Sequence, residues 1–570
     1  MAELKWNELP QSSNENVEGL KSAINVNRII ATLLCQRGIS DYEAAKQFFR
    51  PTINQLHNPF LFKDMKKAVD RIELAIEKGQ KIMVYGDYDV DGTTSVAIVF
   101  SFLSEFTNAI EYYIPDRYKE GYGVSKAGID YAAQNNFSLI ISLDCGIRSE
   151  KLVEYSNSKG IDFIICDHHL PSETLPPALA ILDAKVPGES YPFKELSGCG
   201  VGFKLIQALC ISKKLPDERY LQYLDLVAIS TCCDIVPIVD ENRVIVKYGL
   251  EKLNQNPTLG LKVLKESCIN KKELITSDVV FYIGPRINAV GRLYDAKTAV
   301  KLLIVKNEED AIDYAEILNS TNTERKGIDE TITAQALEMI SNDALHPNRF
   351  TNVLFSPDWH KGVIGIVASR IIEHHYRPTI VLGFSDGKIS GSARSIKGFD
   401  IHEALIECRD LLVQFGGHTH AAGLSLLPEN LPLFIDKFDE IASRHLTRDM
   451  LQPVINYDVK ITENEITPSF IKLLKQFEPF GPGNMTPIFY TSSLRDTGFA
   501  RQMGGGNSHL SLNIQNPNFE TPIKGVAFKH GEKYDKVRSG QSFEALFSIN
   551  EEEFNGRTNV QFNIRDLRQT

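Results

Sequence analysis

Residues 81–92 read KIMVYGDYDVDG, an apolar run that ends in a cluster of carboxylates. The run 81–86 has the length and composition of a buried strand. Four similar runs follow, separated by segments with helical spacing at 93–106, 125–135 and 149–159; the runs are EYYIP (111–115), SLIISLD (138–144), DFIICD (162–167) and LAILDA (179–184). This alternation is typical of an α/β fold with a parallel sheet, in which ligands bind at the carboxyl ends of the strands.

Acidic residues fall at those carboxyl ends. Asp87 follows the first strand, Asp144 the third and Asp167 the fourth. The motif GDYDVDG adds Asp89 and Asp91, which places three carboxylates within five residues. Carboxylates this close raise one another's pKa, so such a cluster usually exists to hold cations.

A calcium-binding EF-hand loop is the rival interpretation, because it also opens with D-x-D-x-D-G. That loop needs a bidentate glutamate at its twelfth position, where this chain has Ile98. It also needs a helix before it, where this chain has a strand. The spacing therefore excludes an EF-hand and leaves a solvated turn as the alternative to a metal site.

The motif Asp167-His168-His169 follows the fourth strand. Two adjacent histidines cannot point the same way from an extended chain, so one can bind a metal while the other faces elsewhere. Alone, the pair is more often a surface feature. Asp144 and Asp234 favour the metal site, because each ends an apolar run and a buried carboxylate without a partner is costly.

The rest of the chain suggests two further domains. Residues 308–343 lack proline and contain one glycine, which predicts a long helix or a helix pair joining two lobes. A second alternation of strands and helices follows, through NVLFS (352–356), VIGIVASRIIEHH (363–375), TIVLGF (379–384), KISGSARS (388–395) and HEALIECRDLLVQF (402–415). After Pro453, short period-two runs predict a small β-barrel.

Two motifs of the second lobe are candidate phosphate sites. GGHTHAAG (416–423) combines a backbone able to approach a phosphate closely with the donors His418 and His420. In SGSARS (390–395), Ser392 and Arg394 lie two residues apart and can share one phosphate. Three arginines near turns are further candidates: Arg117, Arg286 and Arg292.

Composition limits the class of protein. A chain of 570 residues with 43% hydrophobic residues suggests three or four globular domains. We expect a cytoplasmic protein, since there is no signal peptide and no apolar stretch long enough for a membrane span. The nine cysteines form no CxxC pair, so neither a zinc site nor a disulfide framework is indicated. A net charge of -11 is unusual for a nucleic-acid binder, although metal ions offset an aspartate-rich site.

Taken in order, GDYDVDG, SLDCG, CDHH and the aspartate at 234 resemble the DHH phosphoesterase superfamily. GPRINAVGR (284–292), SGSARS and GGHTHAAG narrow the resemblance to the RecJ exonucleases, over roughly residues 50 to 565. The resemblance implies a leader segment (1–50), a parallel-sheet DHH catalytic domain (51–305), a connecting helix (306–345), a DHHA1-like domain that binds phosphate and DNA (346–450) and an OB-fold barrel (451–570).

The resemblance also implies roles for individual residues. Two metal ions would be held by Asp89, Asp91, Asp144, His168 and Asp234. Small-molecule members of the superfamily have a ligand histidine where this chain has Tyr85, and Asp87 would replace it as a ligand. A set of mostly carboxylates favours Mn²⁺ or Mg²⁺ over zinc. His169, next to Asp167, would contact the scissile phosphate or assist proton transfer. The terminal 5′ phosphate would be held by Arg117, Ser392 and Arg394.

The implied activity is 5′ to 3′ digestion of single-stranded DNA in recombination and repair. The enzyme would act as a monomer, with single-stranded-DNA-binding protein and a helicase as family partners. Phe499, Phe528 and Phe562 are candidates for stacking on bases. One alternative is a DHH phosphodiesterase for short oligoribonucleotides or cyclic dinucleotides, which would lack the barrel. Another is an inactive nucleic-acid-binding scaffold, although no expected ligand position is missing.

Overall fold

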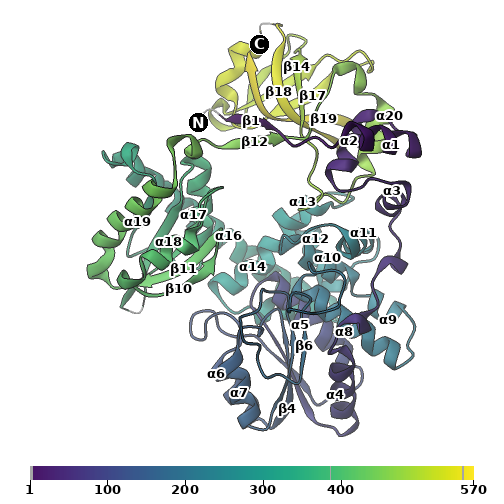
Figure 1. Ribbon diagram of the computed structural model, residues 1–570, viewed down its shortest axis with the longest axis vertical. Coiled ribbons are helices and arrows are strands. Elements are labelled where there is room, and N and C mark those ends of the chain that lie inside the picture. Colours follow the sequence, from purple (N-terminus) through teal and green to yellow (C-terminus); the bar gives the residue numbers. More distant parts are fainter. Residues whose placement is uncertain (1–3, 386, 539, 555–556, 570) are drawn as a thin grey trace. The chain divides into compact units, whose positions relative to one another are not determined.

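The structure is a computed structural model that describes residues 4–385, 387–538, 540–554 and 557–569 (Figure 1). The chain forms two compact units. The larger unit consists of residues 7–291, 296–315 and the chain from Asn456 onward. The smaller unit consists of the chain up to Trp6, residues 292–295 and residues 316–455. The larger unit therefore combines segments that lie far apart in the sequence.

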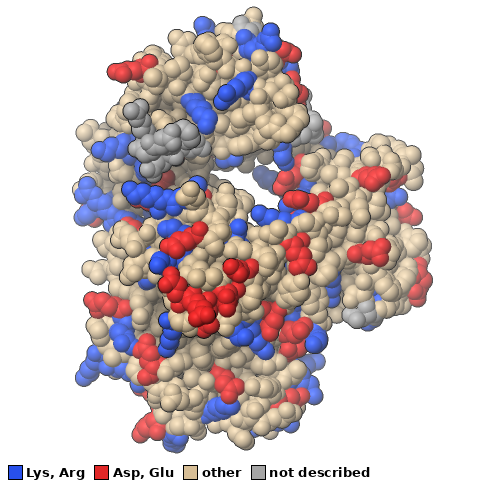
Figure 2. All heavy atoms as spheres, turned by 180° about the vertical axis from the view of Figure 1, so that it is seen from behind, with Lys and Arg blue, Asp and Glu red and all other residues tan. Residues whose placement is uncertain are grey.

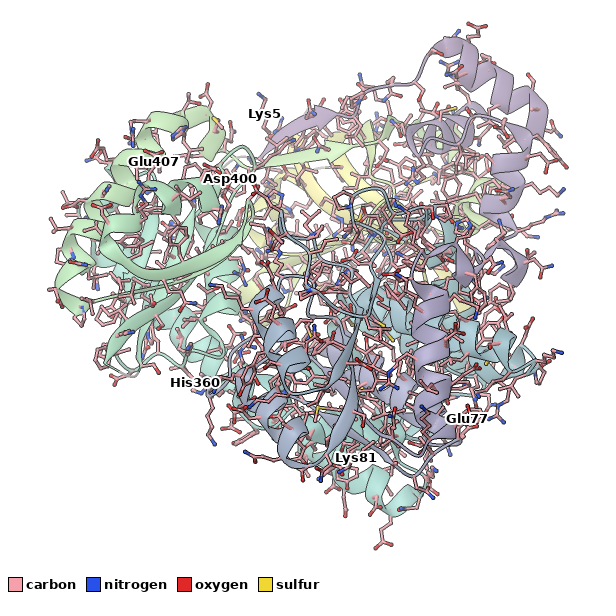
Figure 3. The ribbon with its side chains drawn as sticks, turned by 60° about the horizontal axis from the view of Figure 1, so that its bottom comes forward. Lys5, Glu77, Lys81, His360, Asp400 and Glu407 are labelled. Atoms are coloured by element: carbon pink, nitrogen blue, oxygen red, sulfur yellow. The ribbon has the colours of Figure 1, made fainter. Side chains whose placement is uncertain are left out.

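The first alternation forms a parallel five-stranded sheet in the larger unit, in the order β3-β2-β4-β5-β6. Its strands are β2 (Lys81–Gly86), β3 (Ile110–Tyr113), β4 (Phe137–Leu143), β5 (Asp162–Cys166) and β6 (Ala180–Leu182). This confirms the predicted parallel sheet, and β2, β4 and β5 are neighbours. Lys81, labelled in Figure 3, marks the amino end of β2, opposite the carboxyl ends where the acidic motifs lie.

The predicted crossover helices are α5 (Val90–Leu103), α6 (Lys126–Gln134) and α7 (Glu150–Ser158). Helix α5 is buried over nearly its whole length and packs on α8 (Gly198–Ser212) and α10 (Leu224–Cys233). A helix that is apolar on all sides belongs in a core. Its first turn begins immediately after β2, so burial of α5 fixes the position of the GDYDVDG segment.

The predicted long segment is a single helix, α16 (Glu308–Asn342), followed by the sheet of the smaller unit. That sheet has the order β10-β11-β9-β8-β7, in which only β7 and β8 are parallel. Its strands are β7 (Asn352–Phe355), β8 (Thr379–Ser385), β9 (Lys388–Arg394), β10 (Leu412–His418) and β11 (Ala421–Leu426). In the described part of the chain, no helix is both long and apolar enough to span a membrane.

The segment 402–415, a single run in the sequence pattern, divides into a helix, a 3-10 turn (Arg409–Leu411) and a strand. Helix α18 (Ile401–Glu407) ends after two turns, and strand β10 then forms the sheet edge. Asp400 begins α18 by accepting hydrogen bonds from the amides of His402 and Glu403 (Figure 3). Pairing of β10 with β11 outweighs the local helical spacing. As a result, the residues GGH lie on an exposed edge of the sheet.

The C-terminal region forms a seven-stranded sheet in the order β13-β14-β18-β19-β17-β16-β15. Its strands are β13 (Val459–Lys460), β14 (Phe489–Leu494), β15 (Arg501–Met503), β16 (His509–Ile514), β17 (Ile523–Ala527), β18 (Phe543–Phe554) and β19 (Arg557–Gln569). The leader folds with this barrel through α1 (Asn14–Ile24), α2 (Arg28–Gln36) and α3 (Tyr42–Phe49). Ile30 and Leu33 of α2 belong to the same buried cluster as Phe470, Phe489 and Phe547.

Replacing Leu33 with alanine is expected to destabilise the barrel by about 2–5 kcal/mol, because it leaves a cavity in a core that two distant stretches of sequence share. Thermal unfolding and the rate of limited proteolysis within residues 456–570 measure the effect. The control is Tyr42→Ala in α3, whose side chain is exposed, with an expected change within about 0.5 kcal/mol. Equal stability of the two variants would show that the leader does not support the barrel.

Candidate metal centre

The carboxylates predicted at the strand ends meet at one edge of the parallel sheet. Asp87 follows β2 and Asp144 follows β4. Asp89 begins helix α5 by accepting a hydrogen bond from the amide of Gly92 at 3.0 Å, which turns the chain directly after β2. Asp91 lies in the first turn of the same helix. The strand-to-helix turn therefore presents three carboxylates to the space above the sheet.

His168 lies among three of these carboxylates. Its Nε2 atom is 3.1 Å from Asp144 Oδ1, 3.5 Å from Asp234 Oδ2 and 3.6 Å from Asp91 Oδ2. Asp234 caps the carboxyl end of α10, so this helix brings a ligand from a distant part of the sequence. The structure thus gathers all six predicted metal ligands in one place.

Three overlapping groups of side chains have ligand atoms within 4.8 Å of one another. They are Asp87, Asp89 and Asp144; Asp91, His168 and Asp234; and Asp144, His168 and His169. Asp144 joins the first group to the third, as a residue between two ions would. Carboxylate oxygens with one or two imidazoles suit Mn²⁺ or Mg²⁺.

Burial of this charge supports a cation site. Neither oxygen of Asp87 has a well-formed hydrogen bond, and Oδ2 of Asp234, which lies near His168, likewise has no hydrogen-bond partner. Burial, and then the charges of neighbouring carboxylates, raise the pKa of Asp87 and Asp144 well above the ordinary value. Burial and the charge of Asp91 also raise the pKa of Asp89. Buried carboxylates of like charge are costly unless a cation lies between them.

Asp91 differs, because the protein itself holds its carboxylate. It accepts hydrogen bonds from the amides of Gly198 at 2.6 Å and Cys199 at 2.7 Å, at the amino end of α8, and from Ser230 Oγ at 2.5 Å. A helix amino end stabilises an anion. These contacts leave little freedom to the carboxylate and fix it beside His168.

Tyr85 does not reach the metal centre, although it occupies the position of a ligand histidine in small-molecule members of the superfamily. Its buried hydroxyl donates to the carbonyl oxygen of Gly123 at 3.0 Å and accepts from the amide of Ser125 at 3.1 Å. It therefore anchors the loop after β3. Asp87, in contrast, lies within the cluster.

That loop carries Tyr122, a site residue that the sequence did not reveal. His169 Nδ1 is 2.7 Å from Asp167 Oδ1, and His169 Nε2 is 3.2 Å from the hydroxyl of Tyr122. Burial opposes the charged form of both His169 and Asp167, but their mutual contact raises the pKa of His169 and lowers that of Asp167. The feature of the sequence that could have indicated this loop is the pair of glycines, at 121 and 123, that flank Tyr122. Both have a positive φ in the structure.

In the smaller unit, Ser392 and Arg394 converge as predicted. Arg394 Nη1 donates to Ser392 Oγ at 2.9 Å. Both face Gly365 in the first turn of α17 (Ile364–His374), where an added Cβ would lie 2.9 Å from Arg394 Nη2 and 3.0 Å from Ser392 Oγ. Among the described residues no carboxylate forms an ion pair with Arg394. A hydroxyl, a guanidinium and a helix amino end together suit a phosphate.

The other candidate phosphate contacts are distributed over both units. In the larger unit, Arg117 lies 4.9 Å from the ring centre of Tyr88 and lowers the pKa of Asp87 in part, while Arg286 donates to the carbonyl of Tyr282 at 2.7 Å. In the smaller unit, Arg292 contacts the carbonyl of Gly362 at 3.4 Å, and the exposed His418 and His420 lie at the turn between β10 and β11. Within the larger unit, Arg117 thus lies close enough to Asp87 to lower its pKa.

The three candidate stacking aromatics of the barrel differ in exposure. Phe562 belongs to the barrel core, so the suggestion that it stacks on bases is wrong. Phe499 and Phe528 are exposed, and the ring of Phe528 packs edge-on against His509 at 5.3 Å. Period-two spacing did not distinguish these residues because it does not say which face of a curved sheet is inside.

Three family models match the chain. They are the DHH family, N-terminal domain, over residues 81–231; the DHHA1 domain, over residues 348–444; and the RecJ OB domain, over residues 457–566. The first two cover the metal cluster and the Ser392 and Arg394 pair, apart from Asp234, which lies just beyond the first match.

The chain is also similar to individual proteins over most of its length. It is 37% identical to the single-stranded-DNA-specific exonuclease RecJ of Bacillus subtilis (strain 168), over 99% of this chain and 71% of that protein. It is 33% identical to the protein of the same name from Escherichia coli (strain K12), over 88% of this chain and 90% of that protein. The crystal structure of RecJ in complex with Mn²⁺ from Thermus thermophilus matches with a TM-score of 0.83 at 28% identity, covering 100% of this chain and 80% of that one. The chain belongs to the RecJ family.

Proposed function

We propose that this protein is a metal-dependent exonuclease that hydrolyses single-stranded DNA and acts in DNA recombination and repair. The observation that carries the proposal is the buried cluster of carboxylates around His168, in which Asp87 and Asp234 keep oxygens without hydrogen-bond partners. The relatives named as single-stranded-DNA-specific exonucleases support the choice of substrate.

The donor set suits two Mn²⁺ or Mg²⁺ ions. We assign one to Asp87, Asp89 and Asp144 and the other to Asp91, His168 and Asp234, with Asp144 between them. Bound there, the ions would place positive charge on the reacting phosphodiester and make a water molecule acidic enough to attack it.

The remaining residues of the centre bind and orient the substrate. Asp167 accepts a hydrogen bond from His169 Nδ1 and so directs Nε2 toward the hydroxyl of Tyr122. From there His169 contacts the scissile phosphate or moves a proton to the leaving oxygen. We assign Arg117, Arg286, Arg292, His418 and His420 to contacts with phosphates of the DNA.

We infer that Ser392 and Arg394, at the amino end of α17, bind the terminal 5′ phosphate. A DNA strand held by its 5′ end is cut from its 5′ end, so the pocket sets a 5′ to 3′ direction. Arg394 is half-buried, and burial lowers its pKa, which leaves it a desolvated cation with no acidic partner among the described residues. A charge-assisted contact at such a site is worth about 1.5–3 kcal/mol.

Arg394→Ala is therefore expected to slow digestion of a 5′-phosphorylated strand by about ten- to hundredfold, and to slow digestion of the 5′-hydroxyl strand far less. Initial rates on end-labelled strands, in wild type and variant at one salt concentration, measure the difference. Arg370→Ala, in helix α17 beside the pocket, is the control, because Arg370 is paired with Asp329 at 2.8 Å. Equal losses on both strands would refute the terminal-phosphate pocket.

The same assay tests the activity itself when it includes duplex DNA, short oligoribonucleotides and cyclic dinucleotides. Preferential hydrolysis of cyclic dinucleotides would support the phosphodiesterase alternative instead. On the face seen in Figure 2, acidic side chains gather in one patch and basic ones are dispersed. Since such a patch repels a polyanion, we expect DNA to bind elsewhere.

We further propose the catalytic domain at 51–305, the connecting helix at 306–345, the DHHA1-like domain at 346–450 and the OB-fold domain at 451–570, with the leader 1–50 attached to the last. The protein would act in the cytoplasm as a monomer, together with single-stranded-DNA-binding protein and a helicase. Analytical ultracentrifugation and pull-down with these proteins test these points.

A further inference from the structure

Ile235 has an unusual backbone conformation next to the metal centre. It follows Asp234, the residue that caps the carboxyl end of α10, and has a φ of 61°. The position after a helix cap is commonly glycine, because a side chain there is strained. A β-branched residue suffers most, and among the described residues Ile235 is the only isoleucine, valine or threonine with a positive φ.

Packing does not explain the isoleucine. Val236 and Ile238 after it are buried, and the amide of Ile238 donates to the carbonyl oxygen of Pro482 at 2.7 Å. Ile235 is 66% exposed, so its side chain contributes little to the fold. Strain that is kept without a packing benefit points to a function.

The position of Ile235 suggests which function. Most side chains of the metal cluster are buried, but those of His169 and Asp234 are 40% and 26% exposed, and Asp89 is also partly exposed. Solvent, and hence a substrate, reaches the cluster at these three residues. The exposed Ile235 follows one of them, Asp234, in the chain, and the exposed Tyr122 contacts another, His169.

We propose that Ile235 is a substrate-contact residue, whose side chain packs on the sugar or base next to the scissile phosphate. The proposal rests on the nuclease function proposed above, because it takes a nucleotide as the occupant of the open side. An apolar contact suits this position, since a sugar edge and a base face are apolar while the phosphate is held by charge. Covering part of an isoleucine side chain in this way accounts for a factor of about ten in binding.

The test replaces Ile235 with glycine or asparagine, both of which tolerate a positive φ. We expect opposite effects on stability and on substrate. The melting temperature should rise by about 1–2 °C as strain is relieved in a unit of this size. The kcat/KM for a single-stranded oligodeoxynucleotide should fall about tenfold, and the dissociation constant of the same strand, measured by fluorescence anisotropy in EDTA, should rise by a similar factor. Ile235→Val should behave like wild type.

Lys214 offers a matched control. It also follows the cap of a helix, α8, has a φ of 54° and is exposed. Lys214→Gly should raise the melting temperature and leave kcat/KM unchanged. Mn²⁺ affinity, measured by calorimetry, should not change in Ile235→Gly if the Asp234 carboxylate keeps its place.

Three results would overturn the proposal: an unchanged kcat/KM in Ile235→Gly, a lower melting temperature in that variant, or a loss of Mn²⁺ affinity large enough to explain the lost activity. The first assigns Ile235 no substrate contact, the second assigns it a packing role, and the third assigns the effect to Asp234. If wild-type protein with Mn²⁺ fails to digest single-stranded DNA, the proposed function fails instead. The activity of the wild-type protein therefore distinguishes failure of the proposed function from failure of the Ile235 proposal.

Discussion

Replacing Asp144 with asparagine is expected to abolish hydrolysis, with a loss of at least about a thousandfold in kcat, while the metal-free protein becomes more stable. The loss follows because Asp144 is the carboxylate shared by two groups of candidate ligands. The gain in stability follows because burial and like charges raise the pKa of Asp144, and asparagine removes that charge. Asparagine also tolerates the φ of 60° at this position.

Asp225→Asn is the matched control, since it removes another buried carboxylate of the same unit. Asp225 lies in α10, 3.3 Å from Lys252 Nζ, and accepts a hydrogen bond from the amide of Thr258 at 2.7 Å. Burial raises the pKa of Asp225 as well, but Lys252 and the amide of Thr258 offset part of that effect, so Asp225→Asn should change stability less than Asp144→Asn does and leave kcat unchanged. Thermal unfolding in EDTA and rates in Mn²⁺ measure both. An Asp144→Asn protein that still cuts with Mn²⁺ in excess would refute the metal assignment.

The stability of the metal-free protein is expected to fall as pH rises, by several kcal/mol between about pH 5 and about pH 8. Burial, and then the charges of Asp91 and Asp89, raise the pKa of Asp234 from an ordinary value of 3.8 to about 9. Between these two values the folded chain keeps a proton that the unfolded chain has lost. Unfolding is therefore favoured by rising pH, at about 1.4 kcal/mol per pH unit for each such group.

Metal ions should reverse this dependence, because ionised carboxylates bind them and protonated ones do not. The difference in melting temperature between protein in Mn²⁺ and protein in EDTA should thus widen as pH rises. Denaturation by urea at several pH values, with and without metal, measures it. In EDTA, the stability of the Asp144→Asn variant should decrease less steeply with rising pH than that of wild type. A metal-free protein that grows more stable with rising pH over this range would contradict the account of the cluster.

The strand ends and the metal cluster were predictable because one short segment determines both. An apolar run such as 81–86 can only be buried, and a charge directly after it must lie at the edge of the sheet. Parallel order then brings Asp87, Asp144 and Asp167 to the same edge. Predicting where Asp234 lies requires more than the local sequence, since the position where α10 ends depends on how α10 packs against α5.

What the sequence did not reveal depends on contacts between distant segments. In the sequence, nothing distinguishes Gly365 from other glycines in helices. Its importance follows from strand β9, which brings Ser392 and Arg394 against it. Tyr122 becomes a site residue only because Tyr85 holds its loop through buried hydrogen bonds. The spacing of 402–415 fits a helix, and only the partner strand β11 shows that half of it is extended.

The packing of the leader against the barrel has a consequence for synthesis on the ribosome. The apolar faces of α1 to α3 emerge well before the residues that cover them, from Asn456 onward. At about 5–20 residues per second this interval is on the order of tens of seconds. During that time the nascent chain presents an uncovered apolar surface along α1 to α3. We therefore expect the newly made protein to depend on chaperones that bind α1 to α3 during synthesis, and a circular permutant that joins the leader directly to the barrel to fold with less assistance.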